Sequence, residues 1–290
     1  MQPAIVALKV TFVTAFEDEQ AAVALGTGFV VDKERGLILT NRHITGVGPV
    51  RALAIFDRHE ELEVQVVYRD PVHDFGFFRY DPKQLRYTEL AAIQLDPEAL
   101  RVGTEIRVVG NDAGEKLQIL SGTIARVDRN VPEFNTVPRS WFNTSFPKKM
   151  YRKSHVLHEN YEKIFGVFVF FELGSKVYND ENTFYAGAGA GTSGGSSGSP
   201  VLGRHGSAVA LNAAGTDGAA SAFFLPLDRV CYTLSCLRCN EAVRRGSCRA
   251  TFLFKAFDEL RKLGLKEADE VSVREKEREA TGMLLVDSAA

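Results

Sequence analysis

Short runs of apolar and β-branched residues recur along the first part of the chain, and Gly, Pro or Asp residues separate them. Runs of this length without an intervening helical period predict β-strands, and their regular spacing favours a closed antiparallel barrel. We therefore expect a first barrel made of the strands Ile5–Phe12, Ala22–Val31, Leu37–Thr40, Arg51–Phe56, Glu61–Tyr68 and Phe75–Tyr80.

A second set of strand-like runs occupies the part of the chain before position 226. It has the same short length and the same turn residues, so it predicts a second antiparallel barrel and an all-β fold class. The expected strands are Glu105–Gly110, Gln118–Asp128, Thr183–Ala186, Pro200–Leu202, Ala208–Asn212 and Ala220–Leu225.

Three residues carry the chemistry that nucleophilic acyl transfer needs: His43, Asp74 and Ser197. A serine hydroxyl is a weak nucleophile at neutral pH, so it needs an imidazole to take its proton and a carboxylate to orient that imidazole. We predict Ser197 as nucleophile, His43 as base and Asp74 as orienting acid. The order His, Asp, Ser along the chain is of the chymotrypsin type. It places the base and acid on the first barrel, the nucleophile on the second, and the site in the cleft between them.

Glycines surround Ser197 in the segment 194–200. They allow the sharp turn that points two backbone N–H groups at a developing oxyanion, and we expect Gly195 and Ser197 to donate them. By composition alone the run 187–199 also resembles a flexible linker, and His43 or Asp74 taken singly fits a structural role. The strand-like segments on both sides of the glycine run favour a nucleophile loop.

The overall composition is that of a soluble globular chain. The 290 residues are 45% hydrophobic and carry a formal net charge of −2, so nothing calls for a nucleic-acid partner. The apolar stretch 164–173 is far shorter than the roughly 20 residues of a membrane helix, and we predict no membrane span. The first 18 residues lack the features of a secretory signal.

Four cysteines cluster towards the C-terminus: Cys231, Cys236, Cys239 and Cys248. A zinc site or a disulfide pair could use such residues, but the spacing lacks two close pairs. We therefore predict no metal site, and the predicted chemistry needs no cofactor.

Several segments together resemble the HtrA-type serine proteases of the trypsin-like superfamily, and in particular the large nuclear pro-apoptotic branch known from fungi. In the usual HtrA loop Gly-Asn-Ser-Gly-Gly-Pro, Ser196 and Ser199 here replace the Asn and the second Gly, while the nucleophile position is unchanged. The resemblance covers nearly the whole chain. It is carried by residues 26–30, 36–43, 102–110, 121–124 and the nucleophile loop, and for the fungal branch by residues 68–76, 110–116, 194–200 and 224–229.

The resemblance implies a trypsin-like pair of six-stranded antiparallel β-barrels over residues 1–240, followed by a short helix. It implies a serine endopeptidase that acts on protein or peptide substrates, in protein quality control or apoptosis-linked proteolysis, in the nucleus or cytoplasm. It allows a homo-oligomer, although the trimers of bacterial relatives do not transfer to this chain. In the trypsin-like register the primary substrate pocket is lined by Gly191, Ala213, Ala214 and Gly215, which would suit a small aliphatic side chain.

Two stretches depart from the family pattern. Residues 132–176 form a basic insert with an apolar run at 165–171, and it reads either as a surface insertion or, as we favour, as translated intron. Residues 246–290 resemble the opening half of a PDZ domain whose remaining strands are absent. We expect the charged stretch 266–279 inside it to be a solvated loop or helix.

Two other functions compete with the endopeptidase. An inactive protease-like scaffold would bind peptides without turnover if the insert left the oxyanion hole misformed. A serine esterase would use the same triad on ester substrates. An α/β-hydrolase is disfavoured, because its triad runs in the order Ser, acid, His.

Overall fold

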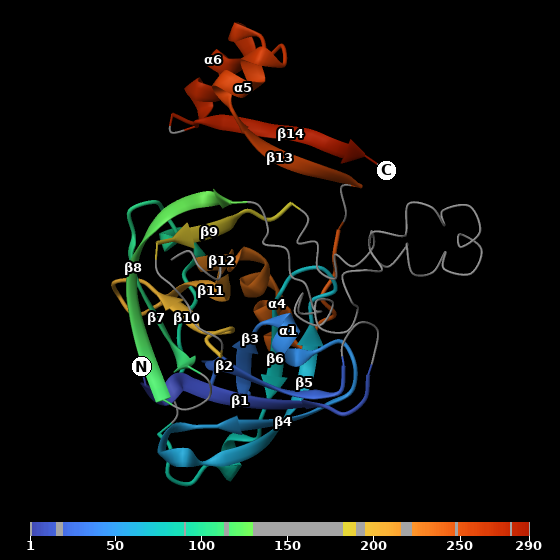
Figure 1. Ribbon diagram of the computed structural model, residues 1–290, viewed down its shortest axis with the longest axis vertical. Helices are drawn as coiled ribbons and strands as arrows, with labels where there is room; N and C mark the ends of the chain where they lie inside the picture. Colours follow the sequence, from blue (N-terminus) through green and yellow to red (C-terminus); the bar gives the residue numbers. More distant parts are fainter. Residues whose placement is uncertain are drawn as a thin grey trace, which may run out of the picture.

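Residues 5–79 close into an antiparallel barrel with the strand order β1-β2-β3-β6-β5-β4 (Figure 1). The computed structural model describes residues 2–15, 20–89, 91–112, 116–129, 182–189, 195–215, 222–246, 249–278 and 280–289. The strands of this barrel are β1 (Ile5–Phe12), β2 (Ala22–Asp32), β3 (Leu37–Thr40), β4 (Val50–Ile55), β5 (Glu61–Arg69) and β6 (Gly76–Arg79).

A second closed barrel follows, with the order β10-β11-β12-β9-β8-β7. Its strands are β7 (Glu105–Asp112), β8 (Lys116–Arg129), β9 (Tyr185–Ala188), β10 (Pro200–Leu202), β11 (Ala208–Gly215) and β12 (Ala222–Pro226). The predicted all-β double barrel is confirmed. Three strands, β1, β3 and β10, begin and end at the predicted residues, whereas β8 and β11 run further than their apolar patterns suggested.

Alternating side chains divide the core of the molecule. Val30 and Ile38 point into the first barrel, while their neighbours Phe29 and Leu39 join a second cluster with Leu211 of the other barrel. This division follows from the two-residue period of a strand, which sends successive side chains to opposite faces. The shared apolar cluster fixes one barrel against the other, and a site built from both depends on it.

Helix α4 (Asp228–Cys239) follows the second barrel and packs Val230 and Leu234 into the shared cluster. Arg238 fixes the helix to β2, because its guanidinium donates to Asp32 Oδ2 at 2.9 Å and to the Val31 carbonyl at 3.0 Å. Its thiols Cys231, Cys236 and Cys239 are free. The other short elements are α1 (Arg42–Thr45) and the 3-10 turns η1 (Gln2–Ala4), η2 (Asp57–His59), η3 (Pro82–Gln84) and η4 (Pro97–Ala99).

The C-terminal unit is a two-stranded antiparallel sheet of β13 (Ala250–Ala256) and β14 (Gly282–Ala289), with α5 (Phe257–Lys262) and α6 (Glu267–Lys276) between the strands. Figure 1 shows it beyond the second barrel. The Asn182 side chain joins the two parts: its amide nitrogen donates to the Ala250 carbonyl at 2.9 Å and its oxygen accepts from the Phe252 N–H at 2.8 Å. The PDZ assignment of this unit stays a prediction, and the insert 132–176 lies outside the described residues.

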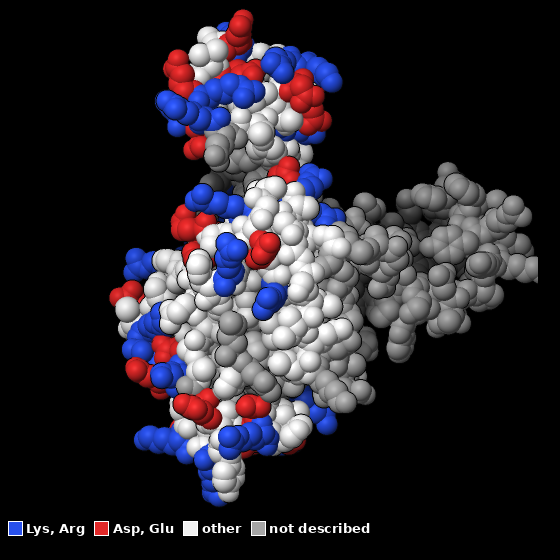
Figure 2. All heavy atoms as spheres, turned by 90° about the vertical axis from the view of Figure 1, so that its left-hand side faces the viewer, with Lys and Arg blue, Asp and Glu red and all other residues white. Residues whose placement is uncertain are grey.

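Charged residues of both signs cover the C-terminal unit, whereas the barrel face below it in Figure 2 has a broad area without charge. Helix α6 contributes to the charged surface of the C-terminal unit, with Glu267 and Asp269 in its first turn and Arg274 and Lys276 in its last. This arrangement of charges favours a helix because it complements the helix dipole. Of the two structures expected for residues 266–279, the stretch adopts the helix over most of its length.

In the part of the chain that the structure describes, we find no helix with the length and apolar character needed to cross a membrane.

Glu60 closes the loop before β7 onto the start of β5. Its carboxylate accepts hydrogen bonds from the backbone N–H groups of Arg86 at 2.7 Å, Tyr87 at 3.1 Å and Thr88 at 2.6 Å. Hydrogen bonding from Thr88, together with these backbone N–H groups, lowers the pKa of Glu60 from 4.5 to about 2.

We expect Glu60→Gln to lower the melting temperature at neutral pH and to matter less in acid. A lowered pKa in the folded state stabilises the protein above the ordinary pKa of 4.5, and this stability disappears as the pH falls towards about 2. The measurement is the difference in melting temperature between wild type and variant at a series of pH values. Glu61→Gln, at the exposed neighbouring position, is the control. A difference that stays constant from pH 6 to pH 3 would contradict this role for Glu60.

Candidate active site

His43 and Asp74 are in direct contact. The Nδ1 atom of His43 lies 3.0 Å from Asp74 Oδ1 and 2.9 Å from Asp74 Oδ2. The backbone N–H of His43 also donates to Asp74 Oδ1 at 3.0 Å. The Asp74 side chain is fully buried, whereas that of His43 is 25% exposed. A buried carboxylate on Nδ1 keeps the proton on that nitrogen and leaves Nε2 to accept one.

Local structure brings these two residues together. His43 lies in the single turn of α1, directly after β3, and Asp74 lies in the connection between β5 and β6. Strands β3 and β6 pair, so the two segments lie at the same end of the barrel. Asn41, which is fully buried before α1, donates from its side-chain amide to the Asp74 carbonyl at 3.0 Å. Asn41 therefore holds the backbone of Asp74 and also begins the helix that carries His43.

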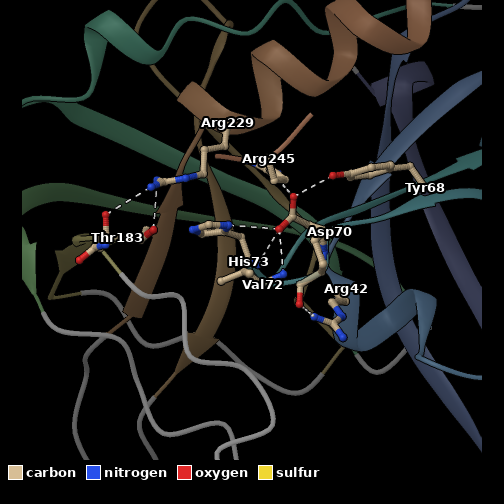
Figure 3. A network of polar contacts seen from close by, with 10 residues as sticks. Arg42, Tyr68, Asp70, Val72, His73, Thr183, Arg229 and Arg245 are labelled. Atoms are coloured by element: carbon tan, nitrogen blue, oxygen red, sulfur yellow. Dashed lines mark hydrogen bonds and ion pairs between the residues drawn. The ribbon is translucent and has the colours of Figure 1, made fainter. Parts of the chain in front are cut away.

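A second carboxylate supports the connection that carries Asp74. Figure 3 shows fully buried Asp70 at the centre of a polar network. Asp70 accepts hydrogen bonds from Tyr68 Oη at 2.9 Å, from the Val72 N–H at 3.0 Å and from the His73 N–H at 2.8 Å. It also forms an ion pair with Arg245, which lies after α4. The network closes the turn 70–73 and ties it to the segment that leads into the C-terminal unit.

Ser197 lies in a turn directly before β10, and it is half-buried. The two glycines beside it have left-handed backbone angles, with φ of +94° at Gly195 and +83° at Gly198. Such angles are strained for other residues, which explains why the loop is rich in glycine. The turn is closed by the Ser199 N–H, which donates to the Ser196 carbonyl at 3.1 Å.

Asn212 holds the loop from the second barrel. Its side-chain amide donates to the Ser196 carbonyl at 2.8 Å and lies 3.2 Å from Ser196 Oγ. Its backbone carbonyl accepts from the Gly198 N–H at 3.0 Å, and its N–H donates to the Ser199 carbonyl at 2.9 Å. Nothing in the apolar pattern of the sequence marks an asparagine that bonds to a loop, so the sequence predicts Asn212 only as part of a strand.

Thr27 holds the same loop from the first barrel. Its backbone N–H donates to the Ser197 carbonyl at 2.8 Å, and its hydroxyl donates to the Gly195 carbonyl at 3.0 Å. The structure thus places His43 and Asp74 in direct contact. Hydrogen bonds from Thr27 hold the Ser197 loop against the barrel that carries both residues. The available sequence signal for Thr27 is the glycine on each side of it. These glycines mark a tightly packed stretch of strand, because a Cβ atom at Gly26 or Gly28 would lie within 3 Å of Ile44 or Ile38.

The predicted substrate pocket is described in part. Ala213 is 1% exposed and lies at an irregularity in the β11–β12 pairing, Ala214 is half-buried, and Gly215 is exposed at the end of β11. Gly191 lies outside the described residues. Among the described side chains, no three His, Cys, Asp or Glu residues gather as a metal site. The pocket role of these residues stays a prediction.

The double barrel and the contact between His43 and Asp74 are typical of the trypsin-like class of proteins, and the sequence comparison agrees. Residues 26–211 match the family described as trypsin-like peptidase domain, so the chain belongs to that family. It is 44% identical over 284 residues to the pro-apoptotic serine protease NMA111 of Kluyveromyces lactis, covering 98% of this chain and 25% of that protein. It is 46% identical over 297 residues to protease Do-like 7 of Arabidopsis thaliana, covering 99% of this chain and 24% of that protein.

The chain therefore spans about a quarter of the length of these relatives. The predicted resemblance to HtrA-type proteases of the pro-apoptotic branch is confirmed by them. Among solved structures, the HtrA-type protease AlgW with a tripeptide is similar at 19% identity and a TM-score of 0.56, covering 92% of this chain and 70% of that one. Deg5 is similar at 20% identity and a TM-score of 0.52, covering 82% of this chain and 90% of that one. These two show the shared fold.

Proposed function

We propose that the chain is a serine endopeptidase in which Ser197, His43 and Asp74 act as a catalytic triad. The observation that carries the proposal is the buried Asp74 carboxylate, which places both oxygens within 3.0 Å of His43 Nδ1. A carboxylate that is buried against an imidazole in this way orients the ring and stabilises the imidazolium that forms when the ring accepts a proton.

In the proposed reaction, the Ser197 oxygen attacks the carbonyl carbon of a peptide bond while His43 Nε2 takes the hydroxyl proton. The N–H groups of Gly195 and Ser197 stabilise the oxyanion, and one such donor is worth about 3 kcal/mol of transition-state stabilisation. The imidazolium then gives its proton to the leaving amine, the C–N bond breaks, and an acyl-enzyme remains. Water, deprotonated by His43, hydrolyses the ester and releases Ser197.

The substrates we propose are unfolded or flexible protein segments, because an extended chain can enter the cleft between two barrels and a tightly folded one cannot. The small residues Ala213, Ala214 and Gly215, with Gly191, would accept a small aliphatic side chain. The name of the Kluyveromyces lactis relative supports a place in apoptosis-linked proteolysis, and the family resemblance supports quality control.

The test is covalent labelling of the purified chain with a fluorophosphonate probe, which reacts with an activated serine. We expect a single adduct by intact mass, and peptide mapping should place it on Ser197. Ser197→Ala is the negative control, and Ser199→Ala tests whether another serine of the loop reacts instead.

No labelling of a folded sample would contradict the endopeptidase. Binding of an unfolded polypeptide without labelling would identify an inactive scaffold in its place. Labelling at Ser197 with hydrolysis of esters but not of an unfolded protein such as reduced casein would identify an esterase.

A further inference from the structure

The inference concerns Thr27, and it rests on the proposed function of Ser197. Thr27 is a fully buried residue of β2, and all of its polar groups are engaged. They bond to three parts of the molecule: the nucleophile loop, the strand that precedes His43, and the second barrel. We propose that Thr27 is a positioning residue whose hydroxyl holds the Gly195 carbonyl and thereby limits the movement of the N–H of the same residue, the proposed oxyanion donor.

The direction of the Thr27 hydroxyl is fixed by its surroundings. The backbone N–H of Asn111, in β7, donates to Thr27 Oγ1 at 2.9 Å. A hydroxyl has a single proton, and with Asn111 already donating to the oxygen, that proton is directed to the Gly195 carbonyl at 3.0 Å. The carbonyl of Gly195 therefore points towards β2, into the protein.

This orientation bears on the proposed chemistry because Gly195 is at a flexible point of the chain. Its φ of +94° lies in a region that glycine enters freely, so the residue has little intrinsic preference for one peptide orientation. The Gly195 carbonyl and N–H lie in neighbouring peptide planes that meet at the Cα atom, so holding the carbonyl fixes one plane and leaves the N–H, the expected oxyanion donor, only the rotations about φ and ψ of that residue. Misplacement of a catalytic group by about 1 Å can cost on the order of 100-fold in rate.

The backbone of Thr27 extends the same link to the base. Its N–H donates to the Ser197 carbonyl at 2.8 Å, and its carbonyl accepts from Thr40 Oγ1 at 2.7 Å. Thr40 ends β3 and lies three residues before His43. One residue thus connects the proposed nucleophile, the proposed oxyanion donor and the strand that leads to the proposed base.

The experiment compares Thr27→Ala with Thr27→Ser, since these two variants differ by the hydroxyl alone. We expect Thr27→Ser to stay near wild type and Thr27→Ala to lose about 10- to 100-fold in kcat and in the rate of fluorophosphonate labelling. KM should change little, because the hydroxyl acts on a group that bonds to the transition state and not to the substrate. Thr27→Val, which keeps the side-chain volume without the hydroxyl, should behave as Thr27→Ala does and covers the case in which the smaller variant fails to fold.

The affinity for a transition-state analogue distinguishes a positioning role of Thr27 from a purely structural one. A peptide boronate places an anion in the oxyanion hole, so its affinity should fall by the same factor as kcat in Thr27→Ala. Thr88→Ala and Thr88→Ser form the matched control pair, because the Thr88 hydroxyl also bonds to a carbonyl, that of Asp57 at 2.7 Å, away from the site. We expect that pair to differ in melting temperature and not in boronate affinity.

The outcomes keep the two proposals apart. An active wild type with equal kcat and boronate affinity in Thr27→Ala and Thr27→Ser would overturn the role of Thr27 and leave the endopeptidase standing. A wild type without labelling would overturn the proposed function itself.

Discussion

Asp74→Asn is expected to lower kcat by about 10⁴-fold while the fold and KM stay near wild type. The reason lies in the two contacts that the carboxylate makes with one residue. Asp74 Oδ1 accepts from the backbone N–H of His43, and this contact selects the oxygen of an asparagine amide at that position. The amide nitrogen then faces His43 Nδ1, which lies 2.9 Å from Asp74 Oδ2 in the wild type.

An amide nitrogen donates a proton and cannot accept one. His43 would respond by keeping Nδ1 unprotonated and carrying its proton on Nε2, the nitrogen that must act as base. The measurement is kcat on an unfolded protein substrate, together with the labelling rate at Ser197. Asp81→Asn is the control, because Asp81 is an exposed carboxylate that caps a short turn by accepting from the Lys83 N–H at 3.1 Å. Asp74→Asn with kcat within tenfold of wild type would contradict the assignment.

Gly198→Ala is expected to destabilise the protein by more than about 4 kcal/mol and to abolish activity. Gly198 has a φ of +83°, and a Cβ atom there would lie 2.0 Å from the Thr27 carbonyl oxygen and 2.3 Å from Thr40 Oγ1. These atoms cannot yield easily, since both are buried and bonded to each other. The loop must therefore leave the first barrel, and the melting temperature should fall by about 10 °C.

Gly103→Ala provides the matched control for this substitution. Gly103 has a φ of +88°, almost the same backbone conformation, but nothing lies within 4 Å of a Cβ placed there. We expect only the cost of the left-handed conformation, about 1–2 kcal/mol, and full activity. Circular dichroism melts and labelling rates of the two variants separate steric exclusion from backbone strain. Equal losses in both variants would show that contact with Thr27 and Thr40 does not decide the outcome.

The barrels could be predicted from the sequence because their information is local. Short apolar and β-branched runs such as Ile5–Phe12 and Leu37–Thr40, with the turn residues around them, define a strand without reference to the rest of the chain. The residues proposed as base and acid were predictable because their residue types are required by the chemistry. Their contact is seen in the structure, while their roles, like those of Ser197, Gly195 and the pocket residues, stay predictions.

The supporting residues could not be predicted in the same way. Thr27, Asn41 and Asn212 are common residue types in strands and loops, and their importance comes from partners that are distant in the sequence. Asp70 follows the same rule, since its ion-pair partner Arg245 lies beyond the second barrel. Hydrogen bonds between residues distant in the sequence produce no hydrophobic periodicity and no motif spacing, so only the folded arrangement reveals them.

The hydrogen bond between Thr27 and Gly195 joins positions that are 168 residues apart. Chains are synthesised from the N-terminus and their domains fold largely in that order. The barrel that carries His43 and Asp74 therefore emerges first, and the segment around Ser197 follows after three of the six strands of the second barrel, β7, β8 and β9, with the other three still to be made. A nascent chain therefore holds the proposed base and acid before the proposed nucleophile and the strand that carries Asn212 have been made, so under this proposal it cannot yet cut itself or its neighbours on the ribosome.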